Sequence, residues 1–471
     1  MNKKENNCVS QEEIYRQNSF LDTISHEWTK NFISRNGRKP IFCCQNYGCQ
    51  MNEHDSENIK GMMIRAGFDI VERGDADFVL FNTCCVRDHA EQRVFGNIGA
   101  LAKTKTEHPE MIIGVCGCMM QQQDTAKQLF RRFPYVDIVF GTHALYSFPE
   151  LLYRTLTTGS RVFDTRESDG QIAEHLPTLN AKSVSAYVTI MYGCNNFCTY
   201  CIVPYVRGRE RSRKPDDILF EIQELTQKGV CEITLLGQNV NSYGKDLDDD
   251  IDFAKLLREI DKKTDVKRIR FMTSHPKDLS DALIEAMAQC DTLCKHIHLP
   301  VQSGSNNILK RMNRKYSREE YLLLIEKLRK QVPDIEITTD IIVGFPGESE
   351  VDFLQTLDLV DQVGFASAFT FMYSPRTGTS AAIMEDQIDK NTKKERLLIL
   401  NELQARKCAE NNSKYVGKAL EVLVEGCDER GIAYGKTGNF KTINFPGEPS
   451  LIGKFKTVKV EECKKNALVG Y

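Results

Sequence analysis

The stretch "AYVTIMYGCNNFCTYC" (186–201) joins an apolar run, typical of a buried strand, to a loop with three cysteines. Cys194, Cys198 and Cys201 have C-x3-C-x2-C spacing. The loops that follow the strands of βα folds collect the functional side chains. Three thiols clustered in such a loop therefore indicate a metal site rather than the packing of a tight turn.

The strand at 186–193 is the first of six predicted βα units. The later strands are predicted at 231–237, 268–273, 296–301, 335–344 and 367–373, with helices between them such as 216–229, 317–331 and 349–363. Six units are too few to close an eight-stranded barrel, so residues 185–408 are predicted to form an open, partial (βα)6 barrel.

The N-terminal half shows the same alternation of strands and helices. Strands are predicted at 41–44, 77–83, 111–116 and 136–141, and helices at 56–67, 90–101 and 125–133. This alternation indicates a parallel sheet covered by helices over residues 37–156. Residues 1–36 are expected to be a loosely ordered extension with a short helix around Phe20–Phe32, and 157–184 a linker.

Short β-like runs punctuated by Gly and Pro follow a charged helix at about 389–411. They predict a small C-terminal β-barrel over residues 409–471. The predicted fold class is thus α/β, with an N-terminal parallel-sheet domain, a central partial (βα)6 barrel and the small β-barrel.

The composition agrees with a three-domain globular protein. The chain has 471 residues, 41% of them hydrophobic, and a net charge of −3, so any basic footprint for nucleic acid must be local. The N-terminus carries no signal peptide and no apolar run is long enough to span a membrane, so we expect a cytoplasmic protein. In a reducing compartment, many of the 17 cysteines are better explained as metal ligands than as disulfides.

The number of clustered cysteines constrains the kind of metal site. A structural zinc site takes four ligands, and within twenty residues of this loop His175 is the one additional Cys or His. Three thiolates can instead hold three irons of a four-iron cluster and leave one iron open for a small molecule.

A second set of cysteines lies in the N-terminal half. Cys49, Cys84 and Cys118 each follow a predicted strand, and the carboxyl ends of parallel strands meet at one edge of a sheet. They could therefore converge, or they could be small apolar residues near strand ends. Cys85 and Cys116 are possible competitors, although neighbouring residues of an extended chain point in opposite directions.

These motifs resemble a known family. The C-x3-C-x2-C loop, with Tyr200 before its last cysteine, resembles the signature of the radical S-adenosylmethionine superfamily. The motifs "GCQMN", "NTC" and "GC" resemble the methylthiotransferases, and "GCQMNEHDSE" and "NTCCVRDHAEQRVFGNIG" resemble the tRNA-modifying MiaB type. The resemblance runs from about residue 40 to the C-terminus, where the last module is similar to a TRAM RNA-binding barrel.

The resemblance implies two [4Fe–4S] clusters and S-adenosylmethionine as cofactors. Cys194, Cys198 and Cys201 would bind the cluster that cleaves the cofactor to a 5′-deoxyadenosyl radical; Cys49, Cys84 and Cys118, rather than Cys85 or Cys116, would bind an auxiliary cluster. The implied reaction adds a methylthio group to C2 of N6-isopentenyladenosine beside the anticodon. The implied partners are the tRNA anticodon loop, an electron donor and a sulfur source, and the expected state is a monomer.

Two alternatives stay open at this point. The chain could be a sibling methylthiotransferase that acts on threonylcarbamoyl-adenosine in tRNA or on a ribosomal protein. It could also be a two-cluster RNA-binding or electron-transfer protein that catalyses no transfer.

Contact residues follow from the positions of further motifs. "LLGQNV", "TSHP", "HLPVQSGS" and "TDIIVGFPGE" follow predicted strands, so cofactor contacts are expected at Tyr200, Gln238, Ser274, Gln302 and Gly344, unless these are ordinary turn residues. For RNA, alternation along an extended chain would place the arginines that follow the cysteine loop in one stripe, unless they only guard an edge strand. Lysines between phenylalanines in the last module also suit RNA, or belong to an ordinary barrel surface. The predicted RNA contacts are Arg207, Arg209, Arg211, Arg213, Lys214, Lys436 and Lys441.

Overall fold

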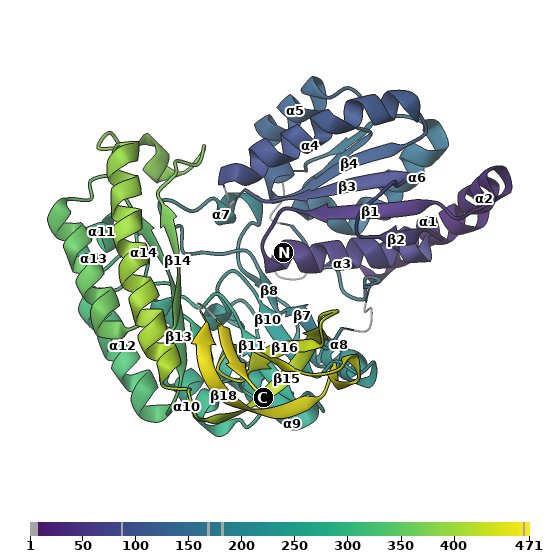
Figure 1. Cartoon of the computed structure of the whole chain (residues 1–471). Coiled ribbons are helices and arrows are strands. Elements are labelled where there is room, and N and C mark those ends of the chain that lie inside the picture. The colour runs from purple at the N-terminus through teal and green to yellow at the C-terminus, as the bar shows by residue number, and fades with distance from the viewer. Residues whose placement is uncertain (1–7, 86–87, 167–169, 180–182, 465–466) are drawn as a thin grey trace. The chain divides into compact units, whose positions relative to one another are not determined.

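The computed structural model describes residues 8–85, 88–166, 170–179, 183–464 and 467–471, and the chain forms two compact units (Figure 1). The first unit comprises Met1–Ala181, Tyr192–Asn195 and Ile202–Arg211, and the second comprises Lys182–Met191, Asn196–Cys201 and Ser212–Tyr471. The chain thus passes between the units within the cysteine loop. In the described part of the chain, no helix is both long enough and apolar enough to cross a membrane.

The first unit contains a six-stranded parallel sheet in the order β2-β1-β3-β4-β5-β6. Its strands are β1 (Ile41–Asn46), β2 (Asp69–Val71), β3 (Phe78–Thr83), β4 (Ile112–Gly117), β5 (Ile138–Phe140) and β6 (Val162–Asp164). The central strands β3 and β4 are buried along their whole length, which is why both are nearly continuous apolar runs. Because β1, β3 and β4 are neighbours, the loops that follow them leave the sheet at one edge.

Helices cover both faces of this sheet, as Figure 1 shows. They are α1 (Gln11–Thr23), α2 (Lys30–Asn36), α3 (Gln50–Arg65), α4 (Asp88–Glu107), α5 (Gln123–Arg132) and α6 (Phe148–Thr158), with short helical turns at Ile24–Thr29, Cys118–Gln121 (η2) and Thr142–Ser147. One apolar layer, with Phe42 and Phe78, packs under α1, α3 and α6. The other, with Phe81 and Val115, packs under α4 and α5.

Two expectations about the flanks of this unit are wrong. Residues 11–36 are helical throughout and not only around Phe20–Phe32. Leu21 is fully buried in the sheet layer, and Trp28 stacks on Phe68 with ring centroids 5.6 Å apart. The expected linker contributes β6, which pairs with β5 as the sixth strand. Both segments are rich in polar residues, and a few buried apolar side chains anchor them.

The second unit contains the predicted partial barrel. Its parallel strands are β7 (Ser185–Thr189), β10 (Glu232–Leu236), β11 (Arg268–Phe271), β12 (His296–His298), β13 (Glu336–Val343) and β14 (Ser367–Met372). They form two three-stranded sheets, and an isolated parallel bridge joins Ile269 of β11 to Leu293, which lies just before β12. The covering helices are α8 (Pro215–Gln227), α9 (Phe253–Lys263), α10 (Asp281–Gln289), α11 (Asn306–Arg311), α12 (Arg318–Gln331), α13 (Glu350–Val363) and α14 (Lys390–Ser413).

A closed five-stranded barrel completes the second unit, so the predicted fold class is confirmed. Its strands are β15 (Ala419–Cys427), β16 (Ile432–Thr437), β17 (Thr442–Pro446), β18 (Phe455–Lys464) and β19 (Ala467–Gly470). Arg268 and Arg270 of β11 donate hydrogen bonds to the carbonyls of Lys436 (2.8 Å) and Thr437 (2.6 Å). The small barrel therefore packs at the start of β11, which leaves the carboxyl ends of the parallel strands for the motif loops.

Candidate functional site

The structure brings together the three N-terminal cysteines that are far apart in the sequence. Cys49 directly precedes α3, Cys84 follows β3 and Cys118 begins η2 immediately after β4. The thiols of Cys49 and Cys84 are hydrogen-bonded to each other. Asn52 Oδ1 accepts hydrogen bonds from the thiols of Cys49 (3.4 Å) and Cys118 (3.8 Å). The topology argument from the sequence therefore predicted a real convergence.

Asn52 is a residue of this site that sequence reasoning missed. Its amide nitrogen donates to Asn82 Oδ1 (2.9 Å) and to the carbonyl of Thr83 (2.8 Å), while Asn82 donates back to the Asn52 carbonyl (2.7 Å). Both asparagines are fully buried, so these bonds fix the amide orientation. The signal was present, because Asn52 ends the "GCQMN" motif and Asn82 begins "NTC".

Gly117 allows the chain to turn from β4 toward Cys118. Its φ is +96° and its ψ −168°, a combination that is essentially restricted to glycine. A Cβ atom here would lie 2.4 Å from both Asn82 Oδ1 and the Thr83 carbonyl oxygen. The "GC" motif is thus a backbone requirement of the site.

A buried cation lies against these thiols. Arg207 follows the short helix α7 (Val203–Val206); its Nε donates to Cys118 Sγ at 3.2 Å, and its Nη2 lies 2.8 Å from Asp55 Oδ2. The hydrogen bond with Cys84 and the charge of Arg207 lower the pKa of Cys49 from 9.0 to about 5. A hydrogen bond with Cys85 and the same charge lower the pKa of Cys118. The thiolate is the form that binds metal, so the site favours the ligating state.

The orientation expected for Cys85 is wrong. A hydrogen bond between its thiol and that of Cys118, together with burial, raises the pKa of Cys85. The extended strand β3 ends at Thr83 and the chain then bends, so strict alternation of side chains does not apply there. Cys116, by contrast, lies within β4 and packs with Cys44 in the apolar layer of the sheet.

The spacing of these thiols bears on the kind of metal group they could hold. Within the residues that the structure describes, no three His, Cys, Asp or Glu side chains are placed to share one metal ion. A four-iron cluster is larger, and each thiolate binds a different iron. Thiols held in one region by pairwise contacts, beside a buried cation, suit this larger anionic group.

The C-x3-C-x2-C loop is held mainly by backbone hydrogen bonds. In the first unit, the N–H of Cys194 donates to the Gly208 carbonyl (3.1 Å). In the second unit, the N–H of Cys201 donates to the Cys198 carbonyl (2.9 Å), and Cys198 Sγ accepts from the buried Arg314 at 3.5 Å. The two cysteines of the second unit are therefore preorganised by local turn geometry and by one distant arginine.

The predicted cofactor contacts lie near the ends of the parallel strands. In the described residues, Gln238 Oε1 and Ser274 Oγ are buried without a hydrogen-bond partner. Gln302 and Gly344 have positive φ values, +71° and +68°, and Tyr200 packs edge-on against a neighbouring ring. The buried polar atoms of Gln238 and Ser274 are available for hydrogen bonds with a polar ligand. The contact of each residue with the cofactor stays a prediction.

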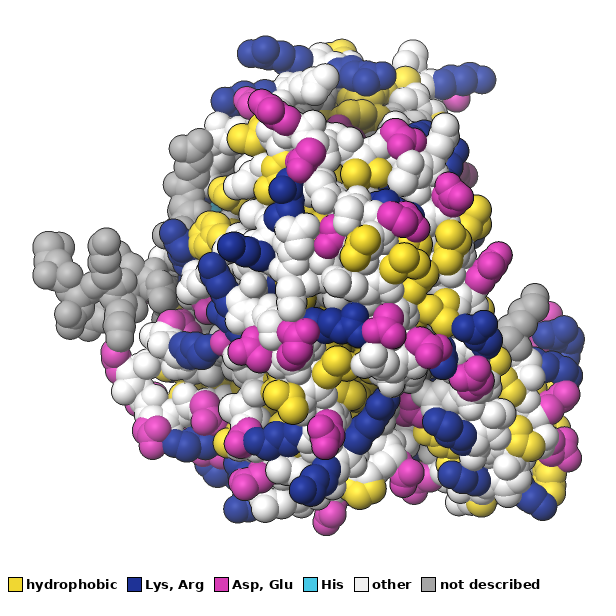
Figure 2. Space-filling model, turned by 90° about the vertical axis from the view of Figure 1, so that its left-hand side faces the viewer, with side chains coloured by type: hydrophobic (Ala, Val, Ile, Leu, Met, Phe, Trp, Pro, Cys, Tyr) yellow, Lys and Arg dark blue, Asp and Glu magenta, His cyan; other side chains and the backbone are white. Residues whose placement is uncertain are grey.

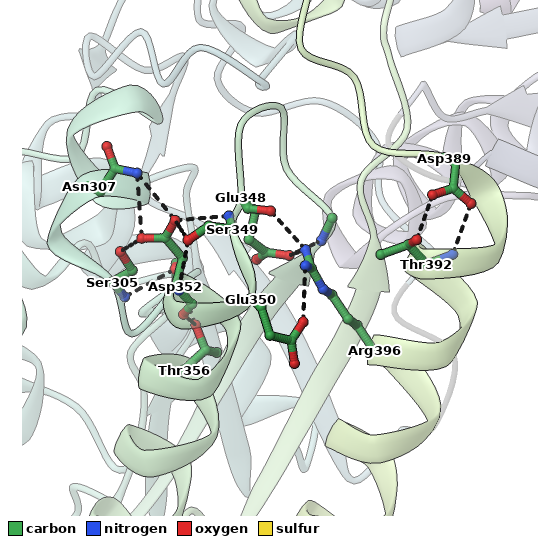
Figure 3. A network of polar contacts seen from close by, with 12 residues as sticks. Ser305, Asn307, Glu348, Ser349, Glu350, Asp352, Thr356, Asp389, Thr392 and Arg396 are labelled. Atoms are coloured by element: carbon green, nitrogen blue, oxygen red, sulfur yellow. Dashed lines mark hydrogen bonds and ion pairs between the residues drawn. The ribbon is translucent and has the colours of Figure 1, made fainter.

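A polar network fixes the loop after β13 (Figure 3). Glu348 Oε2 accepts from the N–H of Gly344 and from Arg396 of α14, both at 2.7 Å. Glu348 is fully buried and Arg396 is 8% exposed, and burial raises the pKa of Glu348. Ser349 caps α13 through a reciprocal hydrogen-bond pair with Asp352. The "GFPGE" motif is therefore clamped between two helices.

The predicted arginine stripe is wrong. Arg207, Arg211 and Arg213 are only 5%, 5% and 6% exposed, whereas Arg209 and Lys214 are exposed. Arg211 donates to the carbonyls of Arg209 (2.8 Å) and Arg207 (3.2 Å), and Arg213 pairs with a glutamate. The extended segment is just β9 (Arg211–Ser212), so the alternation that the stripe required does not exist.

The lysines predicted in the last module also have internal partners. Lys441 is buried, donates to Asn412 Oδ1 (2.9 Å) and lies 3.4 Å from Glu336. Lys436 is half-buried and pairs with Glu425 at 3.1 Å. On the face shown in Figure 2, basic and acidic side chains are intermixed.

Comparisons with known proteins cover nearly the whole chain. The radical SAM superfamily matches residues 188–360, the uncharacterised family UPF0004 matches 42–141 and the TRAM domain matches 413–470. Among solved structures, the radical S-adenosylmethionine methyltransferase TsrM from Kitasatospora setae has a TM-score of 0.53 at 13% identity, covering 74% of this chain and 77% of that one. This likeness concerns the fold alone.

Curated relatives are much more similar in sequence. A protein of Acetivibrio thermocellus named tRNA-2-methylthio-N(6)-dimethylallyladenosine synthase is 50% identical over 470 residues, which is 99% of this chain and 98% of that protein. A Clostridium perfringens protein of the same name is 52% identical over 442 residues, 93% of this chain and 99% of that protein. The chain belongs to the MiaB-type methylthiotransferase family of the radical S-adenosylmethionine superfamily.

Proposed function

We propose that this protein is a tRNA-2-methylthio-N6-dimethylallyladenosine synthase, which adds a methylthio group to C2 of N6-isopentenyladenosine beside the anticodon of tRNA. The observation that carries the proposal is the near-full-length identity of about 50% to relatives of that name. The convergence of Cys49, Cys84 and Cys118 supports it, because methylthiolation needs a second site besides the radical one.

Each cysteine triad has its own task in this proposal. Cys194, Cys198 and Cys201 would hold one [4Fe–4S] cluster, and the three cysteines of the first unit would hold the auxiliary cluster. S-adenosylmethionine bound at an open iron supplies the radical and methyl chemistry that an unactivated aromatic C–H requires. Gln238 and Ser274 would bind polar groups of this cofactor, and the clamped Gly344 would present its backbone to it.

RNA recognition is proposed to use the exposed cations and the TRAM barrel. Arg209 and Lys214 are exposed and would contact phosphates, which positions RNA without reading its sequence. The reaction also requires a low-potential electron donor and a sulfur source as further partners. With tRNA as the substrate, we propose a cytoplasmic monomer.

Nucleoside analysis of tRNA tests the substrate. Deletion of the gene is expected to remove the methylthio group from isopentenyladenosine while threonylcarbamoyl-adenosine derivatives and ribosomal proteins stay unchanged. The wild-type chain should restore the modification, and a Cys49→Ala chain should not. A deletion strain that keeps the methylthio group on isopentenyladenosine would refute the proposal.

An anaerobic assay separates the enzyme from a non-catalytic two-cluster protein. Reconstituted protein with S-adenosylmethionine and dithionite is expected to form 5′-deoxyadenosine. Cys198→Ala should abolish this product, whereas Cys118→Ala should keep it and lose only methylthiolation. Absence of 5′-deoxyadenosine from the wild-type protein would eliminate the enzyme.

A further inference from the structure

An ion pair is buried beside the auxiliary thiols of the first unit. The side chains of Arg207 and Asp55 are 5% and 10% exposed and lie 2.8 Å apart. Removing two charges from water costs several kcal/mol per ion, so a buried pair is a poor device for stability alone. A pair that is buried at such a cost points to a use for the charge itself.

The geometry shows where that charge acts. The planar guanidinium of Arg207 directs Nε toward Cys118 Sγ (3.2 Å) and Nη2 toward Asp55. Asn52 Oδ1, which contacts Cys118 as well, lies 3.5 Å from the same Nη2. Asp55 and Asn52 are three residues apart on α3 and share one face of that helix. The helix therefore holds the guanidinium plane against the sulfur.

The backbone around Arg207 is fixed as well. Arg211 donates to the Arg207 carbonyl (3.2 Å), and the hydroxyl of Thr142 donates to the carbonyl of Val206 (2.7 Å). Val206 also packs with Cys118 in a small apolar cluster. These contacts anchor the segment that carries the arginine independently of its side chain.

We propose that Arg207 is a positioning residue that raises the reduction potential of the auxiliary cluster, and that Asp55 limits this effect. One electron from a low-potential donor adds negative charge to the cluster, and a cation with an N–H···S hydrogen bond stabilises the reduced form more than the oxidised form. The carboxylate of Asp55 opposes that field. The inference rests on the proposed function insofar as these thiols hold a cluster.

The test uses the full-length chain with Cys194, Cys198 and Cys201 replaced by alanine, so that the auxiliary cluster is observed alone. After anaerobic reconstitution, iron and sulfide are counted, and the potential is measured by a redox titration followed by electron paramagnetic resonance. Arg207→Met is expected to make reduction at least about tenfold less favourable, which is 59 mV for one electron. Asp55→Asn is expected to shift the potential in the opposite direction, and Arg207→Lys should have an intermediate effect.

Opposite shifts are the decisive result, because a loosened fold would not raise the potential in one variant and lower it in the other. Asp55→Asn keeps the guanidinium of Arg207, so its reduction potential still tests the proposal if Arg207→Met does not fold. Equal potentials in the parent and in the variants that assemble a cluster would overturn this inference alone. Absence of iron from the parent would overturn the proposed auxiliary site and this inference together.

Discussion

Replacement of Gly117 by alanine is expected to disable the auxiliary site selectively. Gly117 occupies a backbone region open essentially to glycine, which costs alanine about 1–3 kcal/mol. Its Cβ would also approach Asn82 Oδ1 and the Thr83 carbonyl to 2.4 Å. Relief of that overlap by backbone shifts costs about 1–3 kcal/mol more. The sum is about 2–6 kcal/mol. A shift of η2, which carries Cys118, would relieve this strain with the smallest change in the rest of the fold.

The assay is the iron content of the full-length protein after anaerobic reconstitution. Two four-iron clusters give about eight irons per chain, and Gly117→Ala should retain about four. The variant should still form 5′-deoxyadenosine, because Cys194, Cys198 and Cys201 are unchanged, but its methylthiolation should fall at least tenfold.

Gly159 provides a matched control in the same unit. It also has a positive φ (+66°), at the end of α6, but a Cβ atom there would meet no atom within 4 Å. Gly159→Ala should therefore cost only about 1–2 kcal/mol and keep about eight irons. Retention of eight irons by Gly117→Ala, or equal iron loss in both variants, would refute the reasoning.

Three further predictions concern other parts of the molecule. Arg396→Met leaves Glu348 buried without its cation and should lower the free energy of unfolding, measured with denaturant, by about 3–5 kcal/mol. Adding Glu348→Gln should recover at least half of this loss, and no recovery would contradict the ion-pair account. The pKa of Cys49 is about 5 instead of 9.0, so its thiolate stabilises the folded apoprotein at high pH, and this stability is lost as the pH falls toward 5. The alkylation rate of this thiol should therefore reach its plateau by about pH 6. An alkylation rate that still rises at about pH 8 would contradict the lowered pKa. Arg209→Ala and Lys214→Ala should each reduce the slope of log affinity for tRNA against log salt by about 1, and unchanged slopes would exclude phosphate contact.

Sequence patterns predicted the regular elements well where burial is continuous. The strand "FVLFNT" is apolar over most of its length and buried on both faces, so it could be recognised without knowledge of its partners. The helical segment at 11–36 was predicted only around Phe20–Phe32, because Leu21 and a few other apolar residues are dispersed among polar ones. Its helicity depends on docking to the sheet, which is a tertiary effect that local propensity does not encode.

The two cysteine sites also differ in how far local sequence predicts them. The cysteines at 194–201 are close in sequence, so their spacing alone indicated a metal site. Cys49, Cys84 and Cys118 could be joined only through strand order, an argument that holds because β1, β3 and β4 are adjacent. Prediction failed for Cys85, since the chain bends immediately after the strand on which the alternation rule was based.

The supporting residues of the auxiliary site had the weakest signal. Arg207 belongs to a run of basic residues that reads as an exposed stripe, and Asp55 belongs to a polar helix start that reads as solvated surface. A charge is conventionally assigned to the surface because burial is costly, and the cost is offset only by a partner that the sequence does not identify. Here that partner is 152 residues away. A buried charge and an exposed one look identical in a sequence, so the residues that tune a site stay hidden until the fold pairs them.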